Sequence, residues 1–212
     1  MFSSGKWFGA SAGFYPETIG QSLRFEDGNS AYLTDNFSAS NYKTATFSCW
    51  VKRSNLTSYI NLFSGGQGSS NNDFWMRFSN DDTLNFANLY GGSYTSQLST
   101  VGKFRDTTNW YHVVFRIDTT QATDTDRVRI YVNGTQQTLT GSFMGQDTLT
   151  SIGFGGNYYV GRLSYASLYY FDGYLAEVNF IDGTSLPPET FGETKNGVWI
   201  PKAISGLTYG QN

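Results

Sequence analysis

Tyrosines gather in two segments of the chain that also carry glycine and asparagine. Proteins that recognise glycans stack exposed aromatic rings on sugar faces and place polar groups beside them for hydrogen bonds. The residues that fit this pattern are Tyr90 and Tyr94 in the first segment, and Asn157, Tyr158, Tyr159 and Tyr165 in the second. These six residues are candidate ligand or glycan contacts. Tyrosine is also favoured at protein interfaces, so a subunit or receptor contact is the alternative, and we prefer it to a sugar pocket.

Carboxylates are scarce in the chain, and their spacing does not suit glycoside hydrolysis. That reaction needs two carboxylates about 5 to 9.5 Å apart across the scissile bond. Residues two or four apart on a strand would supply such a pair, because they point to the same side. The five glutamates are Glu17, Glu26, Glu177, Glu189 and Glu193. Glu189 and Glu193 are four apart, but they flank a predicted Pro-Pro turn. We therefore expect no catalytic residue; a polysaccharide-cleaving enzyme is the least favoured alternative.

The chain has one histidine and one cysteine, and both are better explained by structure than by chemistry. His112 lies in an alternating run, with Trp110 and Val114 and opposite Tyr111 and Val113. A catalytic role would need a nucleophile beside it, and we expect a hydrogen-bonded structural residue instead. Cys49 is predicted to be a small core residue. Because the chain has only one cysteine and one histidine, it cannot form an intrachain disulfide, a multi-cysteine zinc site or a two-histidine metal site.

Calcium is the one metal that the sequence leaves open. Asp27 and Asn29 lie in the first predicted turn and could contribute to the six to eight oxygens that Ca²⁺ requires. The Asp27-Gly28 pair is more simply explained as a turn, because Asp and Gly both favour turn conformations. We expect no other cofactor.

In the segments that must position these residues, apolar side chains recur at every second position. Residues 47–51, 111–117 and 128–132 alternate between apolar and other side chains, and Gly, Asn and Asp bound such runs. This pattern is typical of half-buried antiparallel strands. Asn133-Gly134 predicts a type I′ hairpin turn, and residues 187–191 are the best candidate for a helical turn, since Pro is tolerated at the start of a helix. The chain is therefore predicted to be all-β.

Length, composition and charge narrow the function further. The chain has 212 residues, a formal net charge of −3 and 17% aromatic residues. That length suits one large all-β domain, and the lack of excess positive charge argues against nucleic acid as a partner. The first residues contain no continuous apolar run like that of a secretory signal, and no window suits a membrane span. We expect a soluble protein made in a reducing cytoplasm.

Five segments, in order, resemble the strands of concanavalin A-like jelly rolls of the laminin-G and pentraxin type. They are residues 22–33, 47–52, 110–114, 128–134 and 171–180. The resemblance implies a jelly-roll sandwich of two antiparallel sheets over residues 21–192. Residues 1–20 would then be an extended N-terminal arm, and residues 193–212 a C-terminal tail with Val198, Trp199 and Ile200 needing burial. The position that this family commonly fills with a calcium-binding aspartate is Ala176 here.

A narrower resemblance lies towards the C-terminus. Residues 176–183, 187–193 and 197–202 look like the version of this domain found in bacteriophage virion proteins. That resemblance implies a non-enzymatic, adhesive module of a tail fibre, knob or capsid decoration. The implied location is the virion surface after synthesis in the host cytoplasm. The implied partners are other virion proteins, further copies of the chain (a homo-oligomer such as a trimer) and a host-surface glycan.

The N-terminal arm would make the contacts with neighbouring subunits. Its candidate assembly residues are Trp7, Phe8, Phe14 and Tyr15. A segment of this kind would become ordered when the virion assembles. The alternative is a carbohydrate-binding, lectin-like module of a cell-surface protein, against which the missing signal sequence argues.

Overall fold

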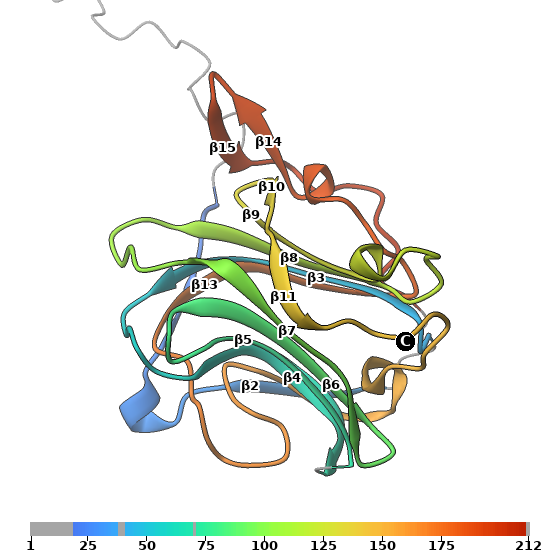
Figure 1. Ribbon diagram of the computed structural model, residues 1–212. Helices are drawn as coiled ribbons and strands as arrows, with labels where there is room; N and C mark the ends of the chain where they lie inside the picture. The colour runs from blue at the N-terminus through green and yellow to red at the C-terminus, as the bar shows by residue number, and fades with distance from the viewer. Residues whose placement is uncertain (1–18, 38–40, 70, 211–212) are drawn as a thin grey trace, which may run out of the picture.

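The computed structural model describes residues 19–37, 41–69 and 71–210, and its described part is a sandwich of two antiparallel sheets with a small hairpin added (Figure 1). The six-stranded sheet contains, in spatial order, β1 (Leu23–Phe25), β13 (Gly173–Asp182), β3 (Thr44–Arg53), β8 (Tyr111–Asp118), β9 (Val128–Val132) and β10 (Thr135–Gln136). The seven-stranded sheet contains β11 (Leu139–Ser142), β7 (Ser93–Lys103), β6 (Thr83–Tyr90), β5 (Asn72–Phe78), β4 (Ile60–Ser69), β12 (Gly156–Val160) and β2 (Leu33–Phe37). The predicted all-β jelly-roll fold is confirmed.

The main core lies between the two sheets and is built from the alternating positions of their strands. Phe47, Cys49 and Val51 point inward from β3, and Phe74 and Met76 point inward from β5. The rings of Phe47 and Phe63 stack across the core with centroids 4.9 Å apart. Each fully buried side chain of this size contributes about 1.5 to 3 kcal/mol. Cys49 is buried as predicted, and burial raises the pKa of its thiol.

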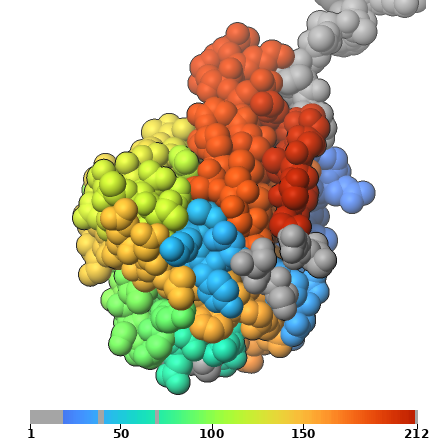
Figure 2. Space-filling model, turned by 90° about the vertical axis from the view of Figure 1, so that its right-hand side faces the viewer, coloured from blue at the N-terminus to red at the C-terminus, as the bar shows by residue number. Residues whose placement is uncertain are grey.

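Two loops add a second apolar layer to the outer faces of the sheets. Residues 161–171 cross the outside of the seven-stranded sheet, where Leu163 packs against Trp75 and Leu89. The segment after β13 crosses the outside of the six-stranded sheet, where Phe191 packs against Val114. Figure 2 shows that this C-terminal part of the chain, orange to red, forms a ridge along the molecule. Both sheets are therefore covered on both faces over part of their area.

Turns and short helices confirm several local predictions. Asn133 and Gly134 both have positive φ, 48° and 76°, as a type I′ turn requires. The predicted helical turn is the 3₁₀ helix η4 (Pro188–Thr190); the others are η1 (Asp27–Asn29), η2 (Asp124–Asp126) and η3 (Ser151–Gly153).

The ends of the chain extend the sandwich. The hairpin of β14 (Gly192–Lys195) and β15 (Val198–Pro201) stands above the six-stranded sheet (Figure 1). Within it, Ile200 is buried, Trp199 is half-buried and Val198 is exposed. The arm residues Trp7, Phe8, Phe14 and Tyr15 lie outside the described residues. Within the described ranges, no helix has the length and apolar character to cross a membrane.

Candidate functional site

The outer face of the seven-stranded sheet carries a cluster of aromatic side chains around one arginine. Because Phe74 and Met76 of β5 point into the core, Trp75 and Arg77 point outward. The members of this cluster, which we call the tyrosine surface, are Tyr59, Trp75, Arg77, Tyr94, Tyr165 and Tyr169. They come from three neighbouring parts of the fold: the start of β4 with β5, the beginning of β7, and the 161–171 loop.

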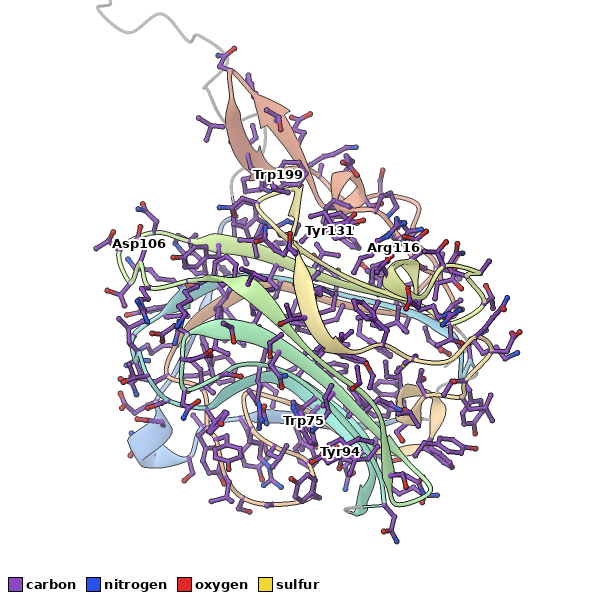
Figure 3. The ribbon with its side chains drawn as sticks, in the orientation of Figure 1. Trp75, Tyr94, Asp106, Arg116, Tyr131 and Trp199 are labelled. Carbon is purple, nitrogen blue, oxygen red and sulfur yellow. The ribbon has the colours of Figure 1, made fainter. Side chains whose placement is uncertain are left out.

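Trp75 is the buried base of the tyrosine surface. Its indole Nε1 donates a hydrogen bond to Asn85 Oδ1 at 2.9 Å, which satisfies its only donor. The ring of Tyr94 meets it edge to face, with centroids 5.9 Å apart, and the ring of Tyr165 lies at 6.3 Å. Tyr94 is 52% exposed and Tyr165 is 39% exposed. Figure 3 shows Trp75 and Tyr94 together at the end of the molecule away from Trp199.

Arg77 lies among these rings. Its guanidinium carbon is 4.4 Å from the Tyr59 ring centroid, 4.9 Å from that of Trp75 and 5.4 Å from that of Tyr169. These distances are within the range of cation–π attraction. Its Nε is buried without a hydrogen-bond partner, and burial lowers the pKa of the guanidinium below its ordinary value. Arginine stays protonated despite such a shift, so the tyrosine surface carries a positive charge.

Two buried polar residues lie on the same face of the sheet as Arg77, Asn61 beside it and Asp73 beyond Trp75. Asn61 is the cross-strand partner of Arg77 on β4, is 0% exposed, and has no hydrogen-bond partner for its amide nitrogen or oxygen among the described residues. Asp73 precedes Trp75 by two residues and is also buried, with the Ser164 hydroxyl 2.5 and 2.6 Å from its carboxyl oxygens. Burial raises the pKa of Asp73 to about 8, so this carboxyl is mostly neutral at pH 7.

A second arginine cluster lies towards the edge of the same sheet. The Arg162 guanidinium carbon is 4.2 Å from the Tyr159 ring centroid and 4.8 Å from that of Tyr32. Tyr32 also contacts Tyr170, with centroids 6.3 Å apart. Unlike Arg77, Arg162 has hydrogen bonds, and its Nε donates to the Leu163 carbonyl at 3.1 Å. We call this group the edge cluster.

The structure brings only part of the predicted contact set together. Tyr94 and Tyr165 lie in the tyrosine surface, and Tyr159 lies in the edge cluster. Tyr90 packs against Phe154, with centroids 5.4 Å apart. Asn157 is exposed on β12 and accepts a hydrogen bond from Asn36 Nδ2 at 3.1 Å.

The prediction that Tyr158 lies at a contact surface is wrong. Tyr158 is 2% exposed, and its ring stacks on Phe37 with centroids 4.0 Å apart. Its hydroxyl donates into the carbonyl oxygens of Ile152 and Phe154, each 2.7 Å away. Adjacent residues on a strand face opposite ways, so Tyr158 points into the core where Tyr159 points out.

Four members of the tyrosine surface are not among the six candidate contacts named from the sequence: Tyr59, Trp75, Arg77 and Tyr169. Trp75 and Arg77 are two apart in a run of strand residues, so the alternation alone places them on one face. An arginine two residues after a tryptophan in a predicted strand was the sequence pattern that could have identified this pair. Tyr59 reaches the surface through the pairing of β4 with β5, which the sequence does not reveal.

The opposite sheet carries a groove with a volume of about 510 Å³ beneath the β14–β15 hairpin. Three tryptophans line it, and we call it the tryptophan groove: Trp50, Trp110 and Trp199, with Ala176, Val198 and residues 19–22 also in its wall. Ala176 thus provides a small apolar wall at the position that the resembling family commonly fills with a calcium-binding aspartate.

His112 holds Trp199 against this sheet. Trp199 Nε1 donates to His112 Nδ1 at 3.0 Å, and His112 Nε2 lies 2.9 Å from Ser48 Oγ. Since the indole can only donate, Nδ1 accepts and Nε2 carries the proton that it donates to Ser48. Burial lowers the pKa of His112 to about 3, which favours this neutral ring. The prediction of a hydrogen-bonded structural histidine is confirmed.

Glu26, Asp27 and Asp172 bring carboxylate oxygens within 4.8 Å of one another. Arg24 already pairs with two of these groups, with Nη1 2.6 Å from Asp172 Oδ1 and Nη2 3.1 Å from Glu26 Oε2. Asp27, one of the predicted calcium ligands, accepts a hydrogen bond from Asn55 Nδ2 at 2.9 Å. With the guanidinium on two of the three carboxylates, these residues do not fit a calcium ion.

Comparisons with known proteins agree on the fold. Residues 26–189 match the family model of the concanavalin A-like lectin/glucanases superfamily. No curated protein sequence matches the chain. Among solved structures, domains LG4–5 of the mouse laminin α1 chain align with a TM-score of 0.58 and 12% identity, over 79% of this chain and 43% of that one.

Two further solved structures have the same architecture. The CBM40 domain of the Ruminococcus gnavus IT-sialidase aligns with a TM-score of 0.53 and 14% identity, over 76% of this chain and 95% of that one. A heptameric SAP-like pentraxin from Limulus polyphemus aligns with a TM-score of 0.51 and 17% identity, over 73% and 70%. At these identities the similarity shows the fold alone.

Proposed function

Because the chain belongs to the concanavalin A-like lectin/glucanases superfamily, we propose that it is a non-catalytic adhesive module of a bacteriophage virion, in a tail fibre, a knob or a capsid decoration. The observation that carries this proposal is the tyrosine surface, where exposed tyrosines surround a buried tryptophan and an arginine. Aromatic rings with a polar tip supply contact area for sugars and for proteins at low cost in conformational entropy. Host-surface contact through this face is the proposed activity.

The arrangement of the molecule supports a role between two partners. The tyrosine surface lies outside the seven-stranded sheet, whereas the tryptophan groove lies outside the six-stranded sheet. The groove also borders residues 19–22, where the described chain follows the N-terminal arm. One face would thus contact the host, and the other would contact virion proteins or further copies of the chain, in an assembly such as a trimer at the virion surface.

The placement of the carboxyl groups supports a non-catalytic role. Glu26 and Asp172 are both paired with Arg24, so neither is free to transfer a proton to a leaving group. Asp73 does have the raised pKa that a general acid needs. It is 0% exposed and bound by the Ser164 hydroxyl, however, so a substrate cannot reach it without moving the 161–171 loop.

The test is binding of the intact chain to host-derived polysaccharide on a glycan array. Tyr165→Ala should weaken binding at least about 10-fold, because stacking on one aromatic ring and burying it contribute about 1.4 kcal/mol or more, which is a factor of ten. Tyr174→Ala is the matched control, since Tyr174 is 38% exposed but lies on β13 of the other sheet. Equal losses in both variants, or no binding by the wild type to any host surface fraction, would contradict the proposal.

A lectin-like module of a cell-surface protein is the second candidate, because the tyrosine surface would serve it equally well. Mass spectrometry of purified virions distinguishes the two, since only the virion module co-purifies with particles. Incubation of the chain with the bound polysaccharide should release no reducing sugar, and release would instead favour a polysaccharide-cleaving enzyme.

A further inference from the structure

We propose that the tyrosine surface selects acidic saccharides, with Arg77 binding the sugar carboxylate; this inference rests on the adhesive function proposed above. Its starting point is the charge of Arg77. Five other cations, Arg24, Lys43, Arg53, Arg105 and Arg129, each form an ion pair with a carboxylate. Arg77 has neither an ion pair nor a hydrogen bond to any residue that the structure describes.

The surroundings of Arg77 stabilise the cation without neutralising it. The rings of Tyr59, Trp75 and Tyr169 attract it through their negative faces, but they carry no net charge. Asp73, the carboxyl on the same face of β5, is mostly neutral at pH 7 and is bound by Ser164. A partly desolvated cation of this kind attracts an anion more strongly than an exposed one does, because water screens it less.

Asn61 supplies the second, independent observation. It pairs with Arg77 across β4 and β5, so both side chains lie on the same face of the sheet. Its amide is fully buried, and among the residues that the structure describes neither its nitrogen nor its oxygen has a hydrogen-bond partner. Buried amides are almost always hydrogen-bonded in folded proteins. Asn61 makes no such bond with Arg77, so the guanidinium, which is only partly buried, keeps its donors for a planar carboxylate that arrives from the exposed side.

The exposed tyrosines indicate that the carboxylate belongs to a sugar. Tyr94, Tyr165 and Tyr169 are all at least 36% exposed around the arginine, and flat rings at such positions suit the apolar faces of a pyranose. The net charge of −3 gives the whole chain no general attraction for polyanions. Recognition would therefore depend on one carboxylate at one position, as in a uronic or sialic acid residue.

The test uses matched ligands that differ only in charge. The probes are oligosaccharides containing glucuronate, galacturonate or sialate, each measured beside its methyl ester by calorimetry with the intact chain. We expect the wild type to bind at least one acid at least 10-fold more tightly than its ester. Equal binding of acid and ester would overturn the inference while leaving the adhesive function standing. No binding to these acids would overturn the inference, and no binding to any host glycan would overturn both.

Two variants and one control locate the site. Arg77→Gln should reduce the affinity for the acid at least 10-fold and change that for the ester less than 2-fold. Asn61→Asp places a carboxylate beside the guanidinium, so it should abolish binding of the acid while the circular dichroism spectrum stays native. Arg162→Gln is the matched control, since Arg162 also stacks on two tyrosines but has other hydrogen bonds. Loss of binding in Arg162→Gln alone would overturn the assignment.

Discussion

At the scale of single residues, Asp73 should give the fold an unusual dependence on pH. Burial raises the pKa of this carboxyl to about 8 in the folded chain, from an ordinary value of 3.8. The folded state therefore binds the proton more tightly than the unfolded state, and the contribution of Asp73 to stability falls as the pH rises from about 4 to 8. The slope contributed by one group approaches about 1.4 kcal/mol per pH unit.

Asp73→Asn removes this ionisation and keeps the shape of the side chain. We expect the stability of the wild type relative to the variant to fall steadily from pH 5 to pH 8, and the variant to be the more stable of the two at pH 8. Urea titrations at four or five pH values measure both slopes. Parallel curves for the two proteins would contradict the buried, protonated carboxyl.

His112 should act in the opposite direction. Its pKa is lowered from 6.5 to about 3 by burial, so the unfolded state gains a proton first and the contribution of His112 to stability falls as the pH drops below 6.5. Protonation of Nδ1 would also remove the acceptor for Trp199 Nε1. Because Asp73 acts oppositely over the same range, the comparison is between variant and wild type: the stability advantage of the wild type over His112→Gln should shrink, by up to about 1.4 kcal/mol per pH unit, as the pH falls from 6.5 to 5. A difference between the two proteins that stays constant over that window would contradict the prediction.

At the scale of elements, the docking of the β14–β15 hairpin depends on a narrow slot for Trp199. A Cβ atom at Gly192 would lie 2.6 Å from the Trp199 ring, and one at Gly134 would lie 2.5 Å from it. Gly192→Ala should therefore displace the indole and cost about 1 to 3 kcal/mol, as overpacking does. Gly28→Ala is the matched control, because the added Cβ would meet only a side-chain oxygen at 3.8 Å.

Thermal unfolding and tryptophan fluorescence measure the two glycine variants. Gly192→Ala should lower the melting temperature and shift the emission to longer wavelength as Trp199 becomes solvated. Gly28→Ala should leave the emission unchanged. It should alter the free energy of unfolding by no more than about 0.5 kcal/mol, as is usual for a surface substitution. A native emission spectrum in Gly192→Ala would show that the slot adapts to the extra methyl group.

Strands such as β3, β8 and β9 could be predicted from the sequence because each has one face in the core and a spacing of two. The same rule assumes that the other face of each strand is exposed to solvent, and that assumption failed at β3, β8 and β5, where Ser48, Val114 and Trp75 on the outer faces are buried. Trp75 and Asp73 point away from the core, yet both are buried, because the 161–171 loop packs over them. The covering loop lies about ninety residues away in the chain. The sequence around β5 therefore contains no pattern that indicates the burial of its outer face.

The candidate site was predictable only in part for the same reason. Tyr94 and Tyr165 are tyrosines next to turn residues, which the sequence shows. Arg77 is distinctive only because its guanidinium has no ion pair and no hydrogen bond among the described residues. An unpaired guanidinium cannot be recognised before the positions of all the carboxylates are known. The prediction for Tyr158 was wrong by one position along the strand, because its neighbour Tyr159 is the residue that faces outward.

At the scale of the whole molecule, the two aromatic surfaces lie on opposite sheets and share no residue. The tyrosine surface sits on the seven-stranded sheet and the tryptophan groove on the six-stranded sheet, with the main core between them. Substitutions at separated sites without shared partners usually have additive effects. We therefore expect adhesion and assembly to be separable by mutation.

Trp110→Ala and Tyr165→Ala test this separation in the intact chain. Trp110→Ala should shift the oligomer towards monomer in light-scattering measurements, because the half-buried indole lines the groove proposed for self-association. The affinity of each chain for glycan should then change less than 2-fold. Tyr165→Ala should do the reverse, losing at least about 10-fold in glycan affinity while the oligomer persists, since its ring lies on the other sheet beside Trp75. A wild type that is monomeric at every concentration would contradict self-association through the groove. Loss of both oligomerisation and glycan affinity in either variant would contradict the independence of the two faces.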